Sequence, residues 1–280
     1  MQQAVRSLIV FFVLILVAIP LISQSDSPVY ARLSYMKVAP GQADAYVRME
    51  REVWKPIHEA RLEAGIITGW QLYRVEYPSG TDAEYDYVVV SNFDDFAKTT
   101  NDFPASVFEA AYPGADEQRI REIGEEAMAM RDLVRTELLI RREGLPSTGP
   151  ATYLLLGKMS VPPGGNTAYL GLERDIWKPI HQAVQDAGAS AGWSVWQMLF
   201  PGGTREPYNF LAVNFYANYE DVDVNFEKPV GAAFQSDFIQ TAHPSLTDAG
   251  WAAMLDLTLA VREGVQRELW ERIEQVSPNQ

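Results

Sequence analysis

The chain contains an internal duplication, and this feature restricts the folds open to it more than any other. The segment at residues 50–58, EREVWKPIH in one-letter code, recurs nearly letter for letter at residues 173–181, a shift of 123 positions. Between positions 50 and 81, almost half of the residues recur at that shift without a gap. Two copies of one supersecondary unit predict a fold with approximate twofold symmetry.

Each copy has the same predicted succession of strands and helices. In the first copy, apolar and β-branched runs predict strands at 30–39, 69–77, 85–93 and 133–140, with helices at 42–64 and 116–131. The second copy predicts strands at 152–161, 193–200, 208–216 and 265–270, with helices at 168–187 and 247–261. The order strand, helix, strand, strand, helix, strand is the split pattern of a ferredoxin-like unit.

The domain limits follow from this pattern and from turn-rich segments. We expect a first repeat at 28–143, a linker rich in Gly, Pro and Ser at 144–150, a second repeat at 151–272 and a tail at 273–280. One unit alone leaves a face of its four-stranded sheet without cover. The expected fold class is therefore α+β, with two ferredoxin-like βαββαβ repeats packed sheet to sheet as an intramolecular α+β barrel.

This layout resembles the dimeric α+β barrel superfamily in a fused, two-repeat form. The resemblance covers nearly all of residues 28–272 and rests on element order and duplication rather than on an active-site motif. It implies the fold more firmly than the function. The functional classes that it implies are cofactor-independent monooxygenases, haem-handling enzymes, small-molecule dehydratases and isomerases, and stress-response proteins. In many members the ligand lies between the sheet and the helices of each unit.

Composition restricts the partners. A net charge of −14 and the absence of a basic run argue against nucleic-acid binding. There is no cysteine, which excludes disulfides and thiolate metal sites. We expect no metal site from the three histidines, because His58 and His181 are predicted to lie on separate, symmetry-related helices. Whether the chain forms an oligomer is left open by the sequence.

The N-terminus has the pattern of a secretory signal. Arg6 precedes an apolar run at residues 8–19, and small residues follow at a plausible cleavage point near residue 25. We therefore expect residues 1–25 to direct export to the periplasm or the cell exterior. An uncleaved anchor at residues 5–22 is the alternative, although a spanning helix needs about 20 apolar residues. Membrane contact is expected only through this segment.

The repeated motif forms a stripe on its predicted helix. At about 100° per residue, Glu50, Trp54 and His58 lie along one border of the core face. The second copy repeats the stripe with Glu173, Trp177 and His181.

A proline also lies inside each of these helices. Pro56 and Pro179 should each remove a backbone hydrogen bond, bend the helix and free a carbonyl group near Glu52 or Asp175.

Two interpretations of the stripe are open. In the functional one, His58 and His181 exchange protons or ligate haem iron, and Glu50 and Glu173 act as their carboxylate partners. The predicted ligand contacts are aromatic: Trp54, Trp177, Trp70, Trp193, Tyr73, Trp196, Tyr85 and Tyr208. In the structural one, these side chains fill the core and bind backbone groups. The unchanged Trp-Lys-Pro-Ile-His, in halves that differ widely elsewhere, favours a requirement beyond filling volume.

The sequence thus predicts an exported tandem α+β barrel that binds a small, largely apolar or aromatic molecule. Cofactor-independent or haem-linked catalysis through the repeated motif is one hypothesis. A non-catalytic ligand-binding, stress-response or assembly module is the alternative. No cofactor is required by the sequence, and no nucleophile elbow, P-loop, zinc-protease or dinucleotide motif is present. The remaining histidine, His243, aligns with Tyr112 and is predicted to be a loop residue before a proline.

Overall fold

The computed structural model describes residues 28–100, 103–225 and 231–278. The predicted export segment lies outside these residues. Within them, no helix combines the length and the apolar character needed to cross a membrane.

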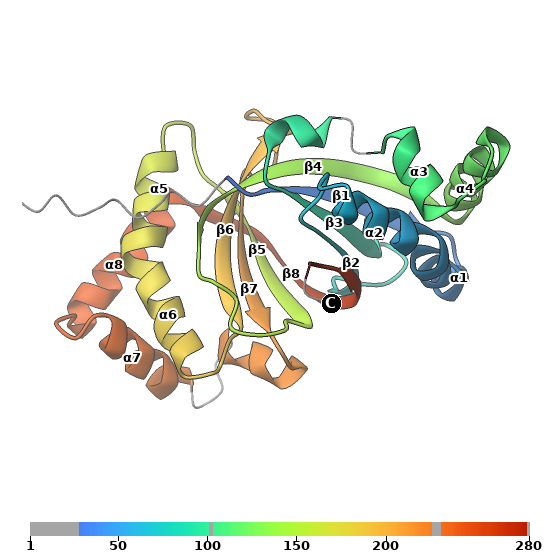
Figure 1. Cartoon of the computed structure of the whole chain (residues 1–280). Coiled ribbons are helices and arrows are strands. Elements are labelled where there is room, and N and C mark those ends of the chain that lie inside the picture. Colours follow the sequence, from blue (N-terminus) through green and yellow to red (C-terminus); the bar gives the residue numbers. More distant parts are fainter. Residues whose placement is uncertain (1–27, 101–102, 226–230, 279–280) are drawn as a thin grey trace, which may run out of the picture.

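Eight strands in the described part of the chain form a closed antiparallel barrel (Figure 1). They are β1 (Tyr30–Val38), β2 (Gly69–Tyr77), β3 (Tyr87–Phe93), β4 (Arg131–Gly144), β5 (Tyr153–Ser160), β6 (Gly192–Phe200), β7 (Phe210–Tyr216) and β8 (Glu263–Val276). The order around the barrel is β1-β3-β2-β8-β5-β7-β6-β4. The predicted α+β class and the closure of a barrel within one chain are confirmed.

The two halves are joined by β4 and β8. Each of these strands has 14 residues and is longer than the sequence predicted. The first part of β4 pairs with β1 and its last part pairs with β6, while β8 pairs in the same way with β5 and β2. Each half therefore donates its last strand to the other, which leaves no edge of the described barrel unpaired.

Helices cover the outside of the barrel in two groups on opposite sides (Figure 1). The first group is α1 (Ala43–Met49), α2 (Lys55–Glu63), α3 (Ala105–Ala111) and α4 (Glu117–Met130). The second is α5 (Asn166–Leu172), α6 (Lys178–Asp186), α7 (Gly231–Ala242) and α8 (Asp248–Val261). Short 3₁₀ turns follow β3 and β7 at Phe96–Thr99 and Tyr219–Asn225.

The predicted helix bend takes the form of a π-turn in both repeats. Glu50–Trp54 joins α1 to α2, and Glu173–Trp177 joins α5 to α6. Pro56 and Pro179 are the second residues after these turns and have no N–H to continue a regular α-helical ladder. A wider turn with i to i+5 bonding is a known way to absorb such an interruption.

The strands separate two kinds of core, because successive side chains on a strand point to opposite faces. On β2, Trp70 and Leu72 pack under the first group of helices, whereas Tyr73 and Val75 face the barrel interior. The interior core draws on both repeats and includes Leu33 and Trp270. The structure therefore has two kinds of buried region, one inside the barrel and one beneath each group of helices.

Candidate functional site

His58 is packed between the first group of helices and the sheet. Its side chain is 3% exposed and stacks on Trp70, with ring centroids 4.5 Å apart. The Trp54 ring also lies roughly parallel to the His58 ring, with centroids 6.2 Å apart. The Arg61 guanidinium donates to His58 Nδ1 at 2.8 Å. Burial, reinforced by the charge of Arg61, holds the pKa of His58 well below 6.5, so the ring is neutral near pH 7.

His181 occupies the equivalent position in the second repeat. Its ring stacks on Trp193 with centroids 4.8 Å apart. Burial lowers the pKa of His181 from 6.5 to about 3, even though the residue keeps some exposure. A ring that stays neutral well below pH 6.5 is poorly suited to exchange protons near neutrality. Both histidines instead extend a stack of aromatic rings between helix and sheet.

The two repeated glutamates do not contact the histidines that they were predicted to orient. Each is 3% exposed and lies beside one tyrosine and one arginine: Glu50 beside Tyr46 and Arg131, and Glu173 beside Tyr169 and Arg262. Burial raises the pKa of both carboxyl groups from 4.5 to about 7, against the opposing effect of these neighbours. The prediction of a Glu–Trp–His stripe is therefore wrong for the glutamates, which do not partner the histidines.

The π-turn explains this correction. The stripe was derived from regular spacing of about 100° per residue, which holds for an α-helix. Between Glu50 and Trp54 the backbone winds more widely, so Glu50 leaves the line that Trp54 and His58 still share.

Tyr112 and His243 bind backbone carbonyl groups within the π-turns. The Tyr112 hydroxyl donates to the Val53 carbonyl at 2.7 Å, and His243 Nε2 donates to the Ile176 carbonyl at 3.0 Å. Val53 and Ile176 are counterparts under the duplication. The freed carbonyl thus lies close to Glu52, as predicted, and His243 acts as a backbone cap.

Loss of this cap should destabilise the fold. We expect Tyr112→Phe to lower the free energy of unfolding by about 1–2 kcal/mol, because a part-buried carbonyl loses its donor. His243→Phe should act similarly, whereas His243→Tyr should be milder, since tyrosine serves at the equivalent site. Urea denaturation measures the change. Tyr30→Phe is the control, because the Tyr30 hydroxyl binds none of the described residues. An equal cost for Tyr112→Phe and Tyr30→Phe would contradict the capping role.

The aromatic residues predicted to line one pocket are divided between two faces of the sheet. Trp54, Trp177, Trp70 and Trp193 pack in the layers between helices and sheet. Tyr73, Trp196, Tyr85 and Tyr208 belong to the barrel interior. Residues 70 and 73 are an odd number of positions apart, so strand alternation sends them to opposite sides. The prediction that all eight line one pocket is therefore wrong, because they lie in two separate environments.

The barrel interior contains a cavity of about 860 Å³ near one end of the strands. Its wall is mainly apolar and aromatic, and includes Leu33, Tyr73, Trp196, Leu211, Phe215 and Trp270. Trp193 also borders it. Arg141, Arg272, Gln71 and Asn92 supply polar groups. This size and lining are typical of a binding site for a small organic molecule.

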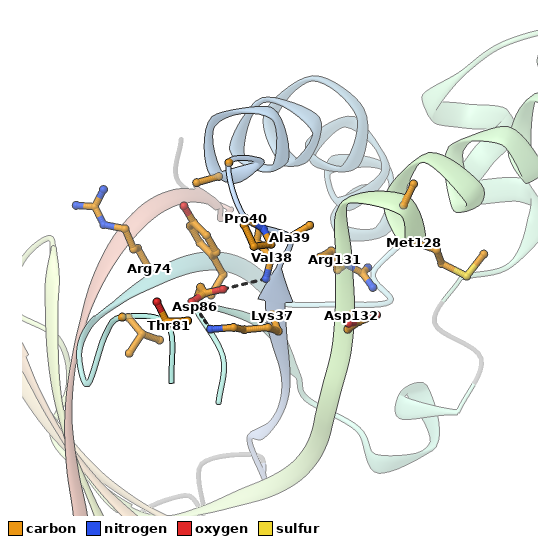
Figure 2. Close-up of a pocket in the computed structure, with 16 residues that line it drawn as sticks. Lys37, Val38, Ala39, Pro40, Arg74, Thr81, Asp86, Met128, Arg131 and Asp132 are labelled. Carbon is orange, nitrogen blue, oxygen red and sulfur yellow. Dashed lines mark hydrogen bonds and ion pairs between the residues drawn. The ribbon is translucent and has the colours of Figure 1, made fainter. Parts of the chain in front are cut away.

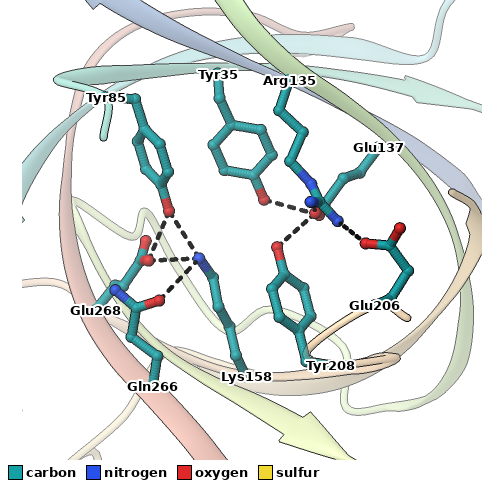
Figure 3. A network of polar contacts seen from close by, with 9 residues as sticks. All are labelled: Tyr35, Tyr85, Arg135, Glu137, Lys158, Glu206, Tyr208, Gln266 and Glu268. Carbon is teal, nitrogen blue, oxygen red and sulfur yellow. Dashed lines mark hydrogen bonds and ion pairs between the residues drawn. The ribbon is translucent and has the colours of Figure 1, made fainter. Parts of the chain in front are cut away.

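A polar network crosses the barrel interior next to the apolar wall of the cavity (Figure 3). On β8, Glu268 of the network lies two residues before Trp270 of the wall. In one half of the network, Lys158 Nζ donates to Glu268 at 2.6 Å and to the Tyr85 hydroxyl at 2.7 Å. The Tyr85 hydroxyl donates in turn to Glu268 at 2.6 Å. Trp270 connects the network to the cavity, because its indole donates to Glu268 at 2.8 Å and its ring lines the cavity wall.

The other half of the network is centred on Glu137 (Figure 3). This carboxylate accepts hydrogen bonds from Tyr35 at 2.9 Å, from Arg135 at 2.6 Å and from Tyr208. Arg135 also binds Glu206, at 2.7 Å. Burial, with the adjacent carboxylate, raises the pKa of Tyr208 above its usual value, so the hydroxyl keeps its proton and remains a donor.

The duplication relates the two halves of the network. Glu137 corresponds to Glu268 and Tyr85 to Tyr208, but Tyr35 is replaced by Lys158 in the second copy. Sequence reasoning missed these buried charges. The available signal was a glutamate retained in both copies within the last strand, where apolar neighbours indicate burial.

A second hollow, of about 660 Å³, lies outside the barrel where β1 ends and α1 begins (Figure 2). Lys37 binds Asp86 there at 3.0 Å, and Asp86 also accepts from the Val38 backbone N–H at 2.9 Å. Since these charged groups already satisfy one another, the hollow is a weaker candidate than the barrel cavity.

The histidines do not fit the haem-ligand role that the resemblance left open. Such a ligand needs an accessible ring nitrogen beside space for the macrocycle. Neither His58 nor His181 lines either of the two cavities, and both rings are stacked on tryptophan. Within the residues that the structure describes, no cluster of three or more His, Cys, Asp or Glu side chains could hold a metal ion.

Comparison with known proteins concerns the fold. No protein-family model and no curated protein matches the sequence. A candidate monooxygenase from Lactobacillus acidophilus NCFM superimposes with a TM-score of 0.52 and 9% identity, over 90% of this chain and 96% of its own. A candidate monooxygenase from Fusobacterium nucleatum gives 0.53 and 8%, over 91% and 96%. At these identities the likeness concerns the fold alone, and it confirms the predicted resemblance to dimeric α+β barrels.

Proposed function

We propose that the protein binds a small, largely apolar or aromatic molecule inside the barrel, against Tyr73, Trp196 and Trp270. The observation that carries this proposal is the cavity of about 860 Å³ with its mainly apolar wall. Burying the apolar surface of a ligand there gains about 25 cal/mol per Å². The aromatic rings of the wall favour a ligand with a flat ring system.

The residues around the cavity support binding rather than catalysis. Among the described lining residues there is no His, Asp or Glu, the side chains used most often as general acids and bases. Burial raises the pKa of Tyr73 to about 12, so its hydroxyl stays protonated. Oxygenation of the bound molecule has as its support only the names of two structural neighbours. In this proposal the repeated Trp-Lys-Pro-Ile-His motif serves helix–sheet packing.

The proposal includes export through residues 1–25, and it treats each repeat as a ferredoxin-like unit. The strand order β4-β1-β3-β2 in one half and β8-β5-β7-β6 in the other supports the second point. N-terminal sequencing of the protein recovered from cells tests the first, because cleavage near residue 25 would remove the apolar segment.

The binding proposal is tested with N-phenyl-1-naphthylamine, an uncharged aromatic probe that fluoresces in apolar surroundings. We expect one probe per chain, with the stoichiometry read by native mass spectrometry. Val90 lines the cavity from β3. Val90→Trp should fill part of the space and weaken binding by about tenfold, the equivalent of about 1.4 kcal/mol of lost burial.

Val265→Trp is the matched control, because Val265 is 42% exposed and does not line the cavity. An absorbance spectrum of the same sample should show no Soret band. The proposal fails if the probe does not bind, or if it binds the Val90→Trp and Val265→Trp variants equally well.

A further inference from the structure

Two arginine side chains line the cavity. Arg141 extends from β4 and Arg272 from β8. Within the described residues, neither guanidinium takes part in a hydrogen bond or an ion pair. An arginine stays charged at any physiological pH and carries five donor hydrogens. These two groups are therefore available to a ligand.

The charges around the cavity differ from those of the chain as a whole. The protein has 37 acidic and 23 basic residues, yet the described lining contains these two arginines and no carboxylate. Nearby acids on the same strands are already paired with cations: Glu143 with Lys178, Glu271 with Arg74, Glu274 with Lys55, and the inward-facing Glu137 and Glu268 with Arg135 and Lys158. The cavity is thus a local positive site in an acidic protein, which favours entry of an anion.

The duplication places the two arginines symmetrically. The shift that pairs Glu137 with Glu268 also pairs Arg141 with Arg272. Their strands, β4 and β8, lie four places apart in a closed order of eight. The guanidinium groups therefore extend from opposite walls of the barrel. Arginine is retained in both copies although Leu139 in one corresponds to Trp270 in the other.

We infer that the ligand is an amphipathic organic anion, with an apolar or aromatic body and one carboxylate-like group held between Arg141 and Arg272. This inference rests on the proposed binding function and specifies its ligand class. The body packs against Trp196 and Trp270. The anionic group receives charge-assisted hydrogen bonds from guanidinium forks, whose geometry matches a carboxylate. Partial exclusion of water strengthens this attraction.

The test compares two probes that share one ring system. 8-Anilinonaphthalene-1-sulfonate carries an anionic group, and N-phenyl-1-naphthylamine lacks it. Arg141→Met and Arg272→Met should each weaken sulfonate binding by about tenfold or more. Binding of the uncharged probe should change by less than about threefold, since its burial is retained. Thermal melts show whether each variant is folded, and the neutral Arg141→Gln or Arg272→Gln takes the place of a methionine variant at that position that does not fold.

Arg142→Met is the matched control. It removes the same charge from the neighbouring position, where Arg142 is exposed and binds Gln197 on the outer face. It should leave both affinities unchanged. A carboxylate arm extends the test: 1-naphthoate should displace the sulfonate probe at a concentration about tenfold lower than 1-naphthamide does.

The outcomes separate this inference from the proposed function. If the two methionine variants weaken the binding of both probes equally, or of neither probe, the anion site is refuted. The cavity would remain supported by the result for Val90→Trp. The same holds if Arg142→Met matches their effect. A sulfonate signal that persists in Val90→Trp would place that probe outside the cavity and also refute the anion site. Failure of the uncharged probe to bind refutes the proposed function, and the inference with it.

Discussion

Replacing Lys158 by methionine should lower the free energy of unfolding by about 3–5 kcal/mol. Lys158 is 3% exposed and its ion-pair partner Glu268 is 1% exposed. The substitution would leave a carboxylate in the barrel interior without its cation. The Tyr85 hydroxyl and the Trp270 indole would still donate to Glu268, but neutral donors do not offset a full charge at low dielectric.

The surroundings of Lys158 should add to this cost. Its ammonium nitrogen lies 5.0 Å from the centroid of the Tyr208 ring and 5.3 Å from that of Tyr85. Cation–π attraction of this kind contributes about 0.5–2 kcal/mol, and more of it where water is excluded. Methionine matches the length of lysine, so the loss would be electrostatic rather than steric.

Urea denaturation of three variants isolates the effect. The double variant Lys158→Met/Glu268→Gln should recover more than half of the loss, because the amide can accept from Trp270 and donate to Tyr85 without carrying charge. Lys98→Met is the control for an exposed pair with Asp94, and should cost less than about 1 kcal/mol. Two results would rule out an unpaired buried charge as the cause of the lost stability. One is a double variant that is no more stable than Lys158→Met, and the other is a cost of Lys158→Met equal to that of Lys98→Met.

The duplication allowed most of the fold to be predicted, because each copy repeats the same local signals. The limits of β2 match the predicted strand, and α4 lies within one residue of the predicted helix. The ends of β4 and β8 were missed. The last residues of β4 include three consecutive charged residues at 141–143, which give no local strand pattern. They become strand only because the other repeat offers an edge to pair with.

The same dependence on the other repeat limited prediction of the site. A charged residue in an alternating strand, such as Lys158, usually indicates a face exposed to solvent. In this chain the face points into a closed barrel, and Tyr208 and Tyr85 from different repeats surround the ammonium group. The Trp-Lys-Pro-Ile-His motif attracted attention because it is unchanged. The π-turn and the stacked rings account for that retention without a ligand.

The stability of the protein should also fall as the pH rises from about 4.5 to about 7, through Glu50 and Glu173. Burial raises the pKa of both carboxyl groups from 4.5 to about 7 in the folded protein. A raised pKa means that the folded state binds the proton more tightly than the unfolded state does. The contribution is thus complete below pH 4.5 and is lost as the pH passes through the folded pKa, at about 3 kcal/mol per glutamate.

Glu50→Gln and Glu173→Gln separate this effect from other titrations. The amide imitates the protonated acid. The free energy of unfolding of each variant should therefore rise relative to that of the parent protein as the pH rises, by up to about 3 kcal/mol near pH 8. The depressed pKa values of His58 and His181 make stability rise with pH, but this term is common to parent and variant and cancels in the difference. Glu117→Gln, at an exposed side chain, should show no such gain. A difference between parent and Glu50→Gln that stays constant from pH 4 to 8 would contradict the prediction, because it would mean that Glu50 has the same pKa in the folded and the unfolded protein, with Tyr46 and Arg131 fully compensating its burial.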